Sequence, residues 1–142
     1  MPIRPETRWF YPIDWPILSR EVRFRRARGR CEHCGRPHGR TVKCLPDGRW
    51  LDDVSGVWRD GNGKPSSWPD LVDFSRFRFT RVVLATCHID HNPTNNRLRN
   101  LKAWCQRCHI LHDRIYHRRQ ARLTWLQRRA LGDLFEGAYR RW

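Results

Sequence analysis

The sequence predicts a small α+β domain organised around a structural metal ion. Three features support this class: a basic helical stretch, a β-branched stretch that leads into a run of metal-ligand residues, and two C-x-x-C pairs. A chain of 142 residues has the size of one domain with a modest core, and such a domain gains much from a bound metal. We therefore expect residues 1–142 to form a single domain.

The first expected element is a basic helix over residues 14–29. Asp14 suits the N-cap, Pro16 suits the first turn, and Gly29 suits the position after the last turn. Arginines occupy much of the surface between these signals. The sequence thus places a positively charged helix directly before the first C-x-x-C pair.

The other elements follow from turn residues and periodicity. Residues 31–40 form an expected zinc knuckle, and residues 41–79 an expected hairpin and loop insert, because "TVKCLPDGRWLD" places a Pro-Asp-Gly turn between two strand-like runs. A strand from Thr80 to Asp90, a polar loop, a short strand "NLKAW" and a helix predict a ββα core over residues 80–117. Apolar residues at helical spacing predict a helical tail over residues 118–142.

The charge of the chain indicates its partners. Lys and Arg together number 29 against 14 Asp and Glu, which gives a formal net charge of +15 and a pI of about 11.0. A field this positive attracts polyanions, and nucleic acid is the leading partner. The alternatives are a solvated basic surface and an anionic membrane surface.

The same composition bears on location. No apolar run approaches the roughly 18 residues of a membrane span, and the start of the chain lacks the apolar core of a signal peptide. Four of the six cysteines fall in C-x-x-C pairs, which suits metal ligation in a reducing compartment. We expect a cytoplasmic protein without a membrane partner.

The two C-x-x-C pairs predict a structural zinc site. The pairs are "CEHC" and "CQRC", and this spacing lets two thiolates face one ion. Both pairs together supply the four thiolates of a closed tetrahedral site, whose ligands are Cys31, Cys34, Cys105 and Cys108. The alternatives are four buried cysteines without metal, or a ligand exchange that involves His33, His38 or Cys44.

The stretch "CHIDHNPTNNRLRNLKAWCQRCHILHD" predicts a catalytic site. Phosphodiester hydrolysis needs a general base and a divalent cation, and a free imidazole titrates near pH 6.5, so His91 is the expected base. Asp90 and His109 are the expected cation ligands, one oxygen and one nitrogen. Asn100 is expected to fix the loop and the imidazole by hydrogen bonds.

Three further residues have open roles in this site. Asp113 follows His109 by one helical turn and is a possible ligand or an orienting partner. His88 precedes Asp90 by two residues and is expected either at the metal or in a structural contact. Asn96 is a rival of Asn100 for the role of the fixed amide.

These motifs resemble the HNH endonucleases, which have a ββα-metal core. The resemblance covers "CEHC" and residues 82 to 113, in the order C-x-x-C, Asp-His, Asn-Leu and C-x-x-C-His, and it is closest to the small phage and bacterial type with a four-cysteine zinc site. It implies that His91 is the general base, that Asp90 and His109 bind a catalytic magnesium or manganese ion, and that Asn100 is the motif asparagine. The implied activity is hydrolysis of DNA in a bacterial or phage-infected cell.

The resemblance leaves alternatives open. Nicking or cleavage of double-stranded DNA is the favoured activity, RNA is a further possible substrate, and a zinc-dependent DNA-binding or phage packaging accessory protein without hydrolysis is the other function. The basic clusters are expected to contact phosphates without reading bases. Their members are Arg25, Arg26 and Arg28 before the first cysteine pair and Arg114, Arg118 and Arg119 after the second.

Overall fold

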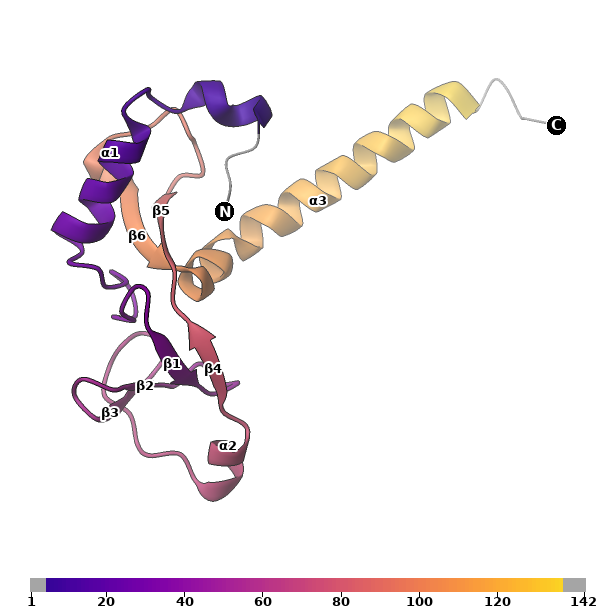
Figure 1. Cartoon of the computed structure of the whole chain (residues 1–142). Coiled ribbons are helices and arrows are strands. Elements are labelled where there is room, and N and C mark those ends of the chain that lie inside the picture. The colour runs from indigo at the N-terminus through magenta and orange to yellow at the C-terminus, as the bar shows by residue number, and fades with distance from the viewer. Residues whose placement is uncertain (1–4, 137–142) are drawn as a thin grey trace. The chain divides into compact units, whose positions relative to one another are not determined.

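The computed structural model describes residues 5–136 and confirms a mixed α+β protein (Figure 1). Two antiparallel sheets and several helices form it, and a long helix comes last in the chain. The chain divides into two compact units, residues 1–109 and residues 110–142. Residues 137–142, the end of the expected tail, lie outside the described range.

A helix occupies most of the predicted range 14–29. After the short 3-10 helix η1 (Pro5–Phe10), α1 (Trp15–Arg20) continues without a break into a π-helix, η2 (Glu21–Arg26). Asp14 caps α1 through its carbonyl, which accepts from Ile17 and Leu18, and not through its side chain as expected. The wider π turn ends where the Ala27 N–H reaches the Val22 carbonyl at 3.1 Å.

The expected insert 41–79 is more ordered than a hairpin with a loop. Strands β1 (Thr41–Cys44), β2 (Trp50–Asp52), β3 (Val57–Arg59) and β4 (Arg78–Arg81) form one antiparallel sheet in the order β3-β2-β1-β4. The predicted turn joins β1 to β2, and Gly48 adopts a φ of 98° there, which only glycine adopts without strain. A short helix, α2 (Leu71–Ser75), precedes β4, and the Asp70 carboxylate caps it at 2.7 Å from the Asp73 N–H.

The predicted single strand from Thr80 to Asp90 is wrong, because the chain forms two strands there. Strand β4 belongs to the four-stranded sheet, and β5 (Leu84–His88) belongs to a second sheet. Between them Val82 is buried and exchanges backbone hydrogen bonds with Gly39 and Arg40 of the knuckle, each 2.8 Å long. The bond between Val82 and Arg40 continues the register of β1 and β4 by one residue, and the chain enters the second sheet at Leu84.

The second sheet leads into the final helix. Strand β5 pairs antiparallel with β6 (Leu101–Cys105), which follows the 3-10 turn η3 (Leu98–Asn100). Helix α3 (Gln106–Glu136) begins directly after β6. Residues 84–117 therefore run strand, strand, helix, and the described part of the second unit consists of α3 residues.

The buried core of the first unit has two parts. One surrounds the four paired cysteines and includes Val42, Trp50, Val82 and Leu84. The other joins η2 to β6 through Val22, Leu101 and Ala103, each at most 1% exposed. Among residues 5–136, no helix combines the length and apolarity that a membrane crossing requires.

Candidate metal centre and ligand-rich loop

The first cysteine pair lies in a tight knuckle. The Gly35 N–H donates to the Cys31 carbonyl at 2.9 Å, and the Cys31 N–H donates to the Arg36 carbonyl at 3.0 Å. Gly35 has a φ of 76°, so a residue with a side chain would be strained at this turn. The local bonds fold the backbone so that Cys31 and Cys34 face the same point.

The second pair lies at the junction of a strand and a helix. Cys105 ends β6, and Cys108 lies in the first turn of α3. The Cys105 N–H donates to the Cys31 sulfur at 3.3 Å, and the Glu32 N–H donates to the Ala103 carbonyl at 2.9 Å. Backbone contacts thus hold the knuckle against β6.

The four sulfurs gather at one buried point. All four cysteines are at most 6% exposed, and their sulfurs lie within 4.8 Å of one another, with Cys34 and Cys105 at 3.6 Å. Sulfurs around a tetrahedral zinc ion, at about 2.3 Å from it, are about 3.8 Å apart. The cysteines form no disulfide. The cluster predicted from sequence is therefore present, and its donors and spacing fit a structural zinc ion.

The electrostatics of the cluster also favour a cation. Hydrogen bonds from Cys108 and Cys34 lower the pKa of Cys105 to about 6, and hydrogen bonds led by the one from Cys105 lower the pKa of Cys31. Hydrogen bonding with Cys105 raises the pKa of Cys34 and of Cys108. Ionisation of one thiol therefore disfavours ionisation of its neighbours. A divalent ion allows all four to be ionised, because it stabilises every thiolate.

Arg36 is a partner of this cluster that the sequence did not reveal. Arg36 is 3% exposed, and its guanidinium donates to the Cys34 sulfur at 3.2 Å and to the Gly48 carbonyl at 2.9 Å and lies over Trp50. Burial acts against its charge, but the attraction of the Cys34 and Cys44 sulfurs outweighs burial and raises the pKa of Arg36. The positive charge offsets part of the negative charge that four thiolates bring.

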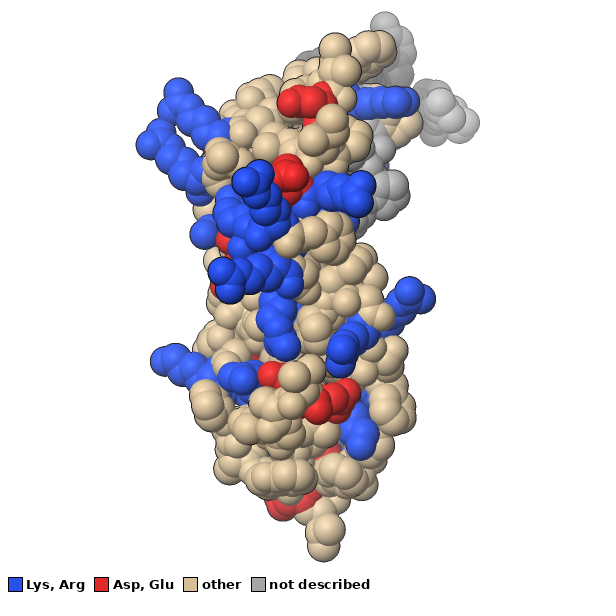
Figure 2. Space-filling model, turned by 60° about the vertical axis from the view of Figure 1, so that its left-hand side comes forward, with Lys and Arg blue, Asp and Glu red and all other residues tan. Residues whose placement is uncertain are grey.

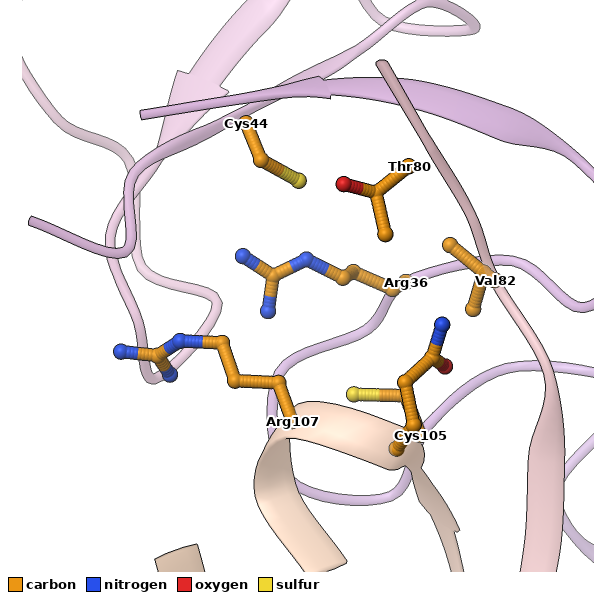
Figure 3. A pocket seen from close by; sticks show the side chains of 7 residues that line it. Arg36, Cys44, Thr80, Val82, Cys105 and Arg107 are labelled. Atoms are coloured by element: carbon orange, nitrogen blue, oxygen red, sulfur yellow. The ribbon is translucent and has the colours of Figure 1, made fainter. Parts of the chain in front are cut away.

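Of the three alternative ligands considered from sequence, His33 and Cys44 lie against the cluster and His38 bonds elsewhere. The His33 ring approaches the Cys108 sulfur at 3.6 Å, and the His38 Nδ1 accepts from the Leu84 N–H at 2.9 Å. Cys44 packs against the cluster from the side and lines a pocket of about 180 Å³. Figure 3 shows Arg36 extending across this pocket between Cys44 and Cys105.

At the other end of β5, Asp90 organises the ligand-rich loop. One oxygen of its carboxylate accepts from the Asn100 side chain at 2.8 Å and from the Asn92 N–H at 2.9 Å, and the other accepts from the Asn95 side chain at 2.7 Å. Partial desolvation acts to raise the pKa of Asp90, but the hydrogen bonds from Asn100, Asn92 and Asn95 lower it to about 2. The carboxylate is therefore anionic at neutral pH.

Asn100 ties the two ends of the loop together. Its side-chain amide donates to Asp90 and to the Asn95 carbonyl, both at 2.8 Å, and its side-chain oxygen accepts from the Asp90 N–H at 3.3 Å. The residue is 8% exposed. Of the two asparagines considered from sequence, Asn100 is the one that contacts Asp90, whereas Asn96 contacts His88 at 2.9 Å.

His88 lies in an aromatic contact. Its ring stacks on Trp15, with 5.2 Å between the centroids, and meets Tyr11 edge-on at 5.7 Å. These rings come from the segment around the start of α1, so His88 fastens that segment to β5. The stack accounts for this residue without a metal.

The expected base and final histidine occupy constrained positions. His91 follows Asp90 and has a φ of 58°, which is uncommon for a residue with a side chain and often marks a functional position. His109 follows Cys108 in the first turn of α3, and both histidines are partly buried. Asp113 belongs to the second unit, where His117 lies 3.7 Å from its carboxylate.

The expected phosphate-binding arginines differ in their contacts. Arg25 is largely exposed and forms an i,i+4 pair with Glu21, and Arg28 is exposed with a φ of 51°. Arg26 instead makes a bidentate bond to Glu32 and donates to the Leu98 and Leu101 carbonyls. Arg26 is thus a brace between η2, the knuckle and β6. In the second unit, Arg114, Arg118 and Arg119 are all exposed.

Comparison with known proteins adds no assignment to this geometry. The chain matches no protein-family profile, no curated protein and no solved structure. The buried cluster of four cysteines, compatible with zinc, is accordingly the firmest functional feature of the molecule.

Proposed function

We propose that the chain is a zinc-stabilised, metal-dependent endonuclease of the HNH type that hydrolyses DNA. One observation carries the proposal. The Asp90 carboxylate is bonded to the Asn100 side chain directly beside His91, at the end of a strand whose hairpin partner ends in the zinc cluster. Asp-His and Asn are the motif residues that the sequence resemblance assigned to catalysis, and the fold joins two of the three through hydrogen bonds.

In this proposal His91 takes the proton of the attacking water. An imidazole is mostly neutral at physiological pH and accepts a proton readily. His91 has a φ of 58°, and the Asn100 side chain donates to the Asn95 carbonyl in the loop that follows His91. A general base in such a position contributes about a hundredfold to ten-thousandfold to the rate.

Asp90 and His109 are the proposed ligands of a magnesium or manganese ion. The carboxylate is a hard donor that stays ionised well below neutral pH, which suits both ions. When bound, the ion supplies Lewis-acid stabilisation of the charge that develops on the phosphate. Asn100 and Asn95 orient the carboxylate, so they act as positioning residues for Asp90.

The basic surface supports DNA as the substrate. Figure 2 shows blue Lys and Arg side chains gathered on the face that carries α1, with few red side chains among them. Arg25 and Arg28 are exposed, and the chain carries a formal charge of +15. Such a field holds phosphates without regard to base sequence.

A DNA-binding protein without hydrolysis is the second candidate. It is favoured by the hydrogen bonds of Asp90, because a carboxylate that already holds Asn92, Asn95 and Asn100 has a structural role with no catalytic ion. The zinc cluster and the basic surface serve either function equally well.

Incubation of supercoiled plasmid with the protein distinguishes the two candidates. The enzyme produces relaxed or linear plasmid when magnesium or manganese is added and none without it. A mobility shift with intact plasmid under every metal condition supports the binding protein and rejects the nuclease. The same assay on a structured RNA tests the alternative substrate.

A further inference from the structure

One face of the pair β1 and β4 is basic and aromatic. The register pairs Thr41 with Arg81 and Lys43 with Phe79. Directly paired residues of antiparallel strands point to the same side of a sheet, so these four side chains share one face. Val42 points to the other side and is 1% exposed, which identifies that side as the buried one.

Aromatic rings form a row on the open face. Phe79 is 67% exposed, an unusual exposure for a phenylalanine on a strand. Its ring meets Phe77 at 5.3 Å between centroids, and Phe77 meets Phe74 at 5.2 Å. The Lys43 ammonium lies 5.6 Å from the Phe77 centroid. The rings of Phe77 and Phe79 meet edge to face, at 89° between their planes, and this aromatic cluster is flanked by a cation on the adjacent strand.

We propose that this face binds single-stranded DNA, with a base stacked on Phe79 and phosphates held by Lys43 and Arg81. The inference rests on the nucleic-acid partner of the proposed function and adds a second surface for it, on the strands β1 and β4. A base can stack on a phenylalanine only when its own face is free, which a single strand offers and a duplex does not. Stacking on an exposed ring between cations is how many proteins hold single strands.

The charges on this face favour DNA over a protein occupant. Neither Thr41 nor Phe79 carries charge, and Lys43 and Arg81 are both positive, so the face complements a polyanion. A symmetric contact with a second copy would place the same cations against one another. Strand β4 lies at the edge of its sheet, as Figure 1 shows, and Arg78 and Arg81 beside its open edge disfavour pairing with another strand.

Fluorescence anisotropy of a labelled oligothymidylate of about 12 nucleotides tests the proposal. The titration uses the zinc-loaded protein without added magnesium or manganese, so cleavage plays no part. Phe79→Ala should weaken binding about 5- to 100-fold, because one stacked base is lost, and Phe79→Trp should retain it. Val54→Ala is the matched control, since Val54 is an equally exposed apolar residue, 64%, in the turn after β2.

Phe79→Ala should reduce the affinity of the protein for duplex DNA of the same length much less than its affinity for the single strand. The proposal is overturned if the wild type does not bind the oligothymidylate, if Phe79→Ala and Val54→Ala behave alike, or if Phe79→Ala instead dissociates a dimer seen by sedimentation. Plasmid cleavage is scored separately with added manganese. If the wild type does not cleave plasmid but binds the oligothymidylate through Phe79, only the nuclease proposal is rejected. If the wild type cleaves plasmid but its binding of the oligothymidylate does not depend on Phe79, only this surface is rejected.

Discussion

At the scale of single residues, the amide of Asn100 holds the ligand-rich loop. Asn100→Ala removes the bonds to Asp90 and Asn95 from a residue that is 8% exposed. Since the loss leaves buried polar groups unpaired, the free energy of unfolding should fall by about 1–3 kcal/mol in urea denaturation. Asn62→Ala, at an exposed turn residue, should change it by less than about 0.5 kcal/mol. Equal effects would show that Asn100 does not stabilise the loop.

The ionisation of Asp90 gives a second test at this scale. Its hydrogen bonds lower the pKa to about 2, below the ordinary value near 3.9 for an aspartate in an unfolded chain. Because the folded value is the lower one, the carboxylate stabilises the fold above about pH 4, and this contribution is lost as pH falls through about 2. An NMR titration of the side-chain carboxyl carbon should find Asp90 fully ionised wherever the protein is folded. A midpoint at pH 4 or above contradicts this.

At the scale of elements, the contact between η2 and β6 fixes the helix beside the sheet. Leu101 is 0% exposed and packs with Val22 and Ala103. Leu101→Ala should cost about 2–5 kcal/mol of stability, because it leaves a cavity in a closed core. Leu98→Ala, three residues earlier and 59% exposed, is the control and should cost little. A small loss in Leu101→Ala would mean that the core collapses around the change.

The four-cysteine cluster gives the second prediction for elements, because it joins the knuckle to β6 and to the first turn of α3. Cys105→Ser should abolish zinc binding and unfold the first unit, since structural zinc contributes roughly 10 kcal/mol to such sites. Cys87→Ser removes an equally buried thiol that lies outside the cluster and should keep about one zinc ion per chain. Metal analysis and thermal melting measure both. A Cys105→Ser protein with its zinc and its melting temperature intact would disprove the cluster.

Local patterns predicted the features that depend on local chemistry. The spacing of Cys31 and Cys34 forces both thiols toward one point, and the Pro-Asp-Gly run specifies the turn between β1 and β2, so both were evident from sequence. The split between β4 and β5 was not, because it depends on their pairing with different strands, β4 with β1 and β5 with β6.

The roles of two arginines were equally beyond sequence reasoning. Local sequence patterns predict that Arg36 and Arg26 are solvated. Arg36 is instead buried against Cys34, and Arg26 binds Glu32 and the Leu101 carbonyl. Contacts with residues elsewhere in the fold determine the roles of both arginines, and no periodicity in the sequence indicates such contacts.

At the scale of the whole molecule, the proposed activity joins the metal cluster, the loop and the basic surface. The cluster holds the hairpin of β5 and β6 at one end, and the loop with Asp90 and His91 lies at the other. In the proposed function, the arginine-rich surface holds the phosphates of DNA. Loss of the base should therefore abolish the chemistry without loss of DNA binding.

The rate of plasmid cleavage by the wild type and by His91→Ala tests this account most directly. Both proteins are compared at the same protein and manganese concentrations, after metal analysis has shown equal zinc. The account predicts that His91→Ala shifts the plasmid with unchanged affinity and cleaves it at about one hundredth of the wild-type rate or less. Cleavage by His91→Ala at the wild-type rate would contradict it.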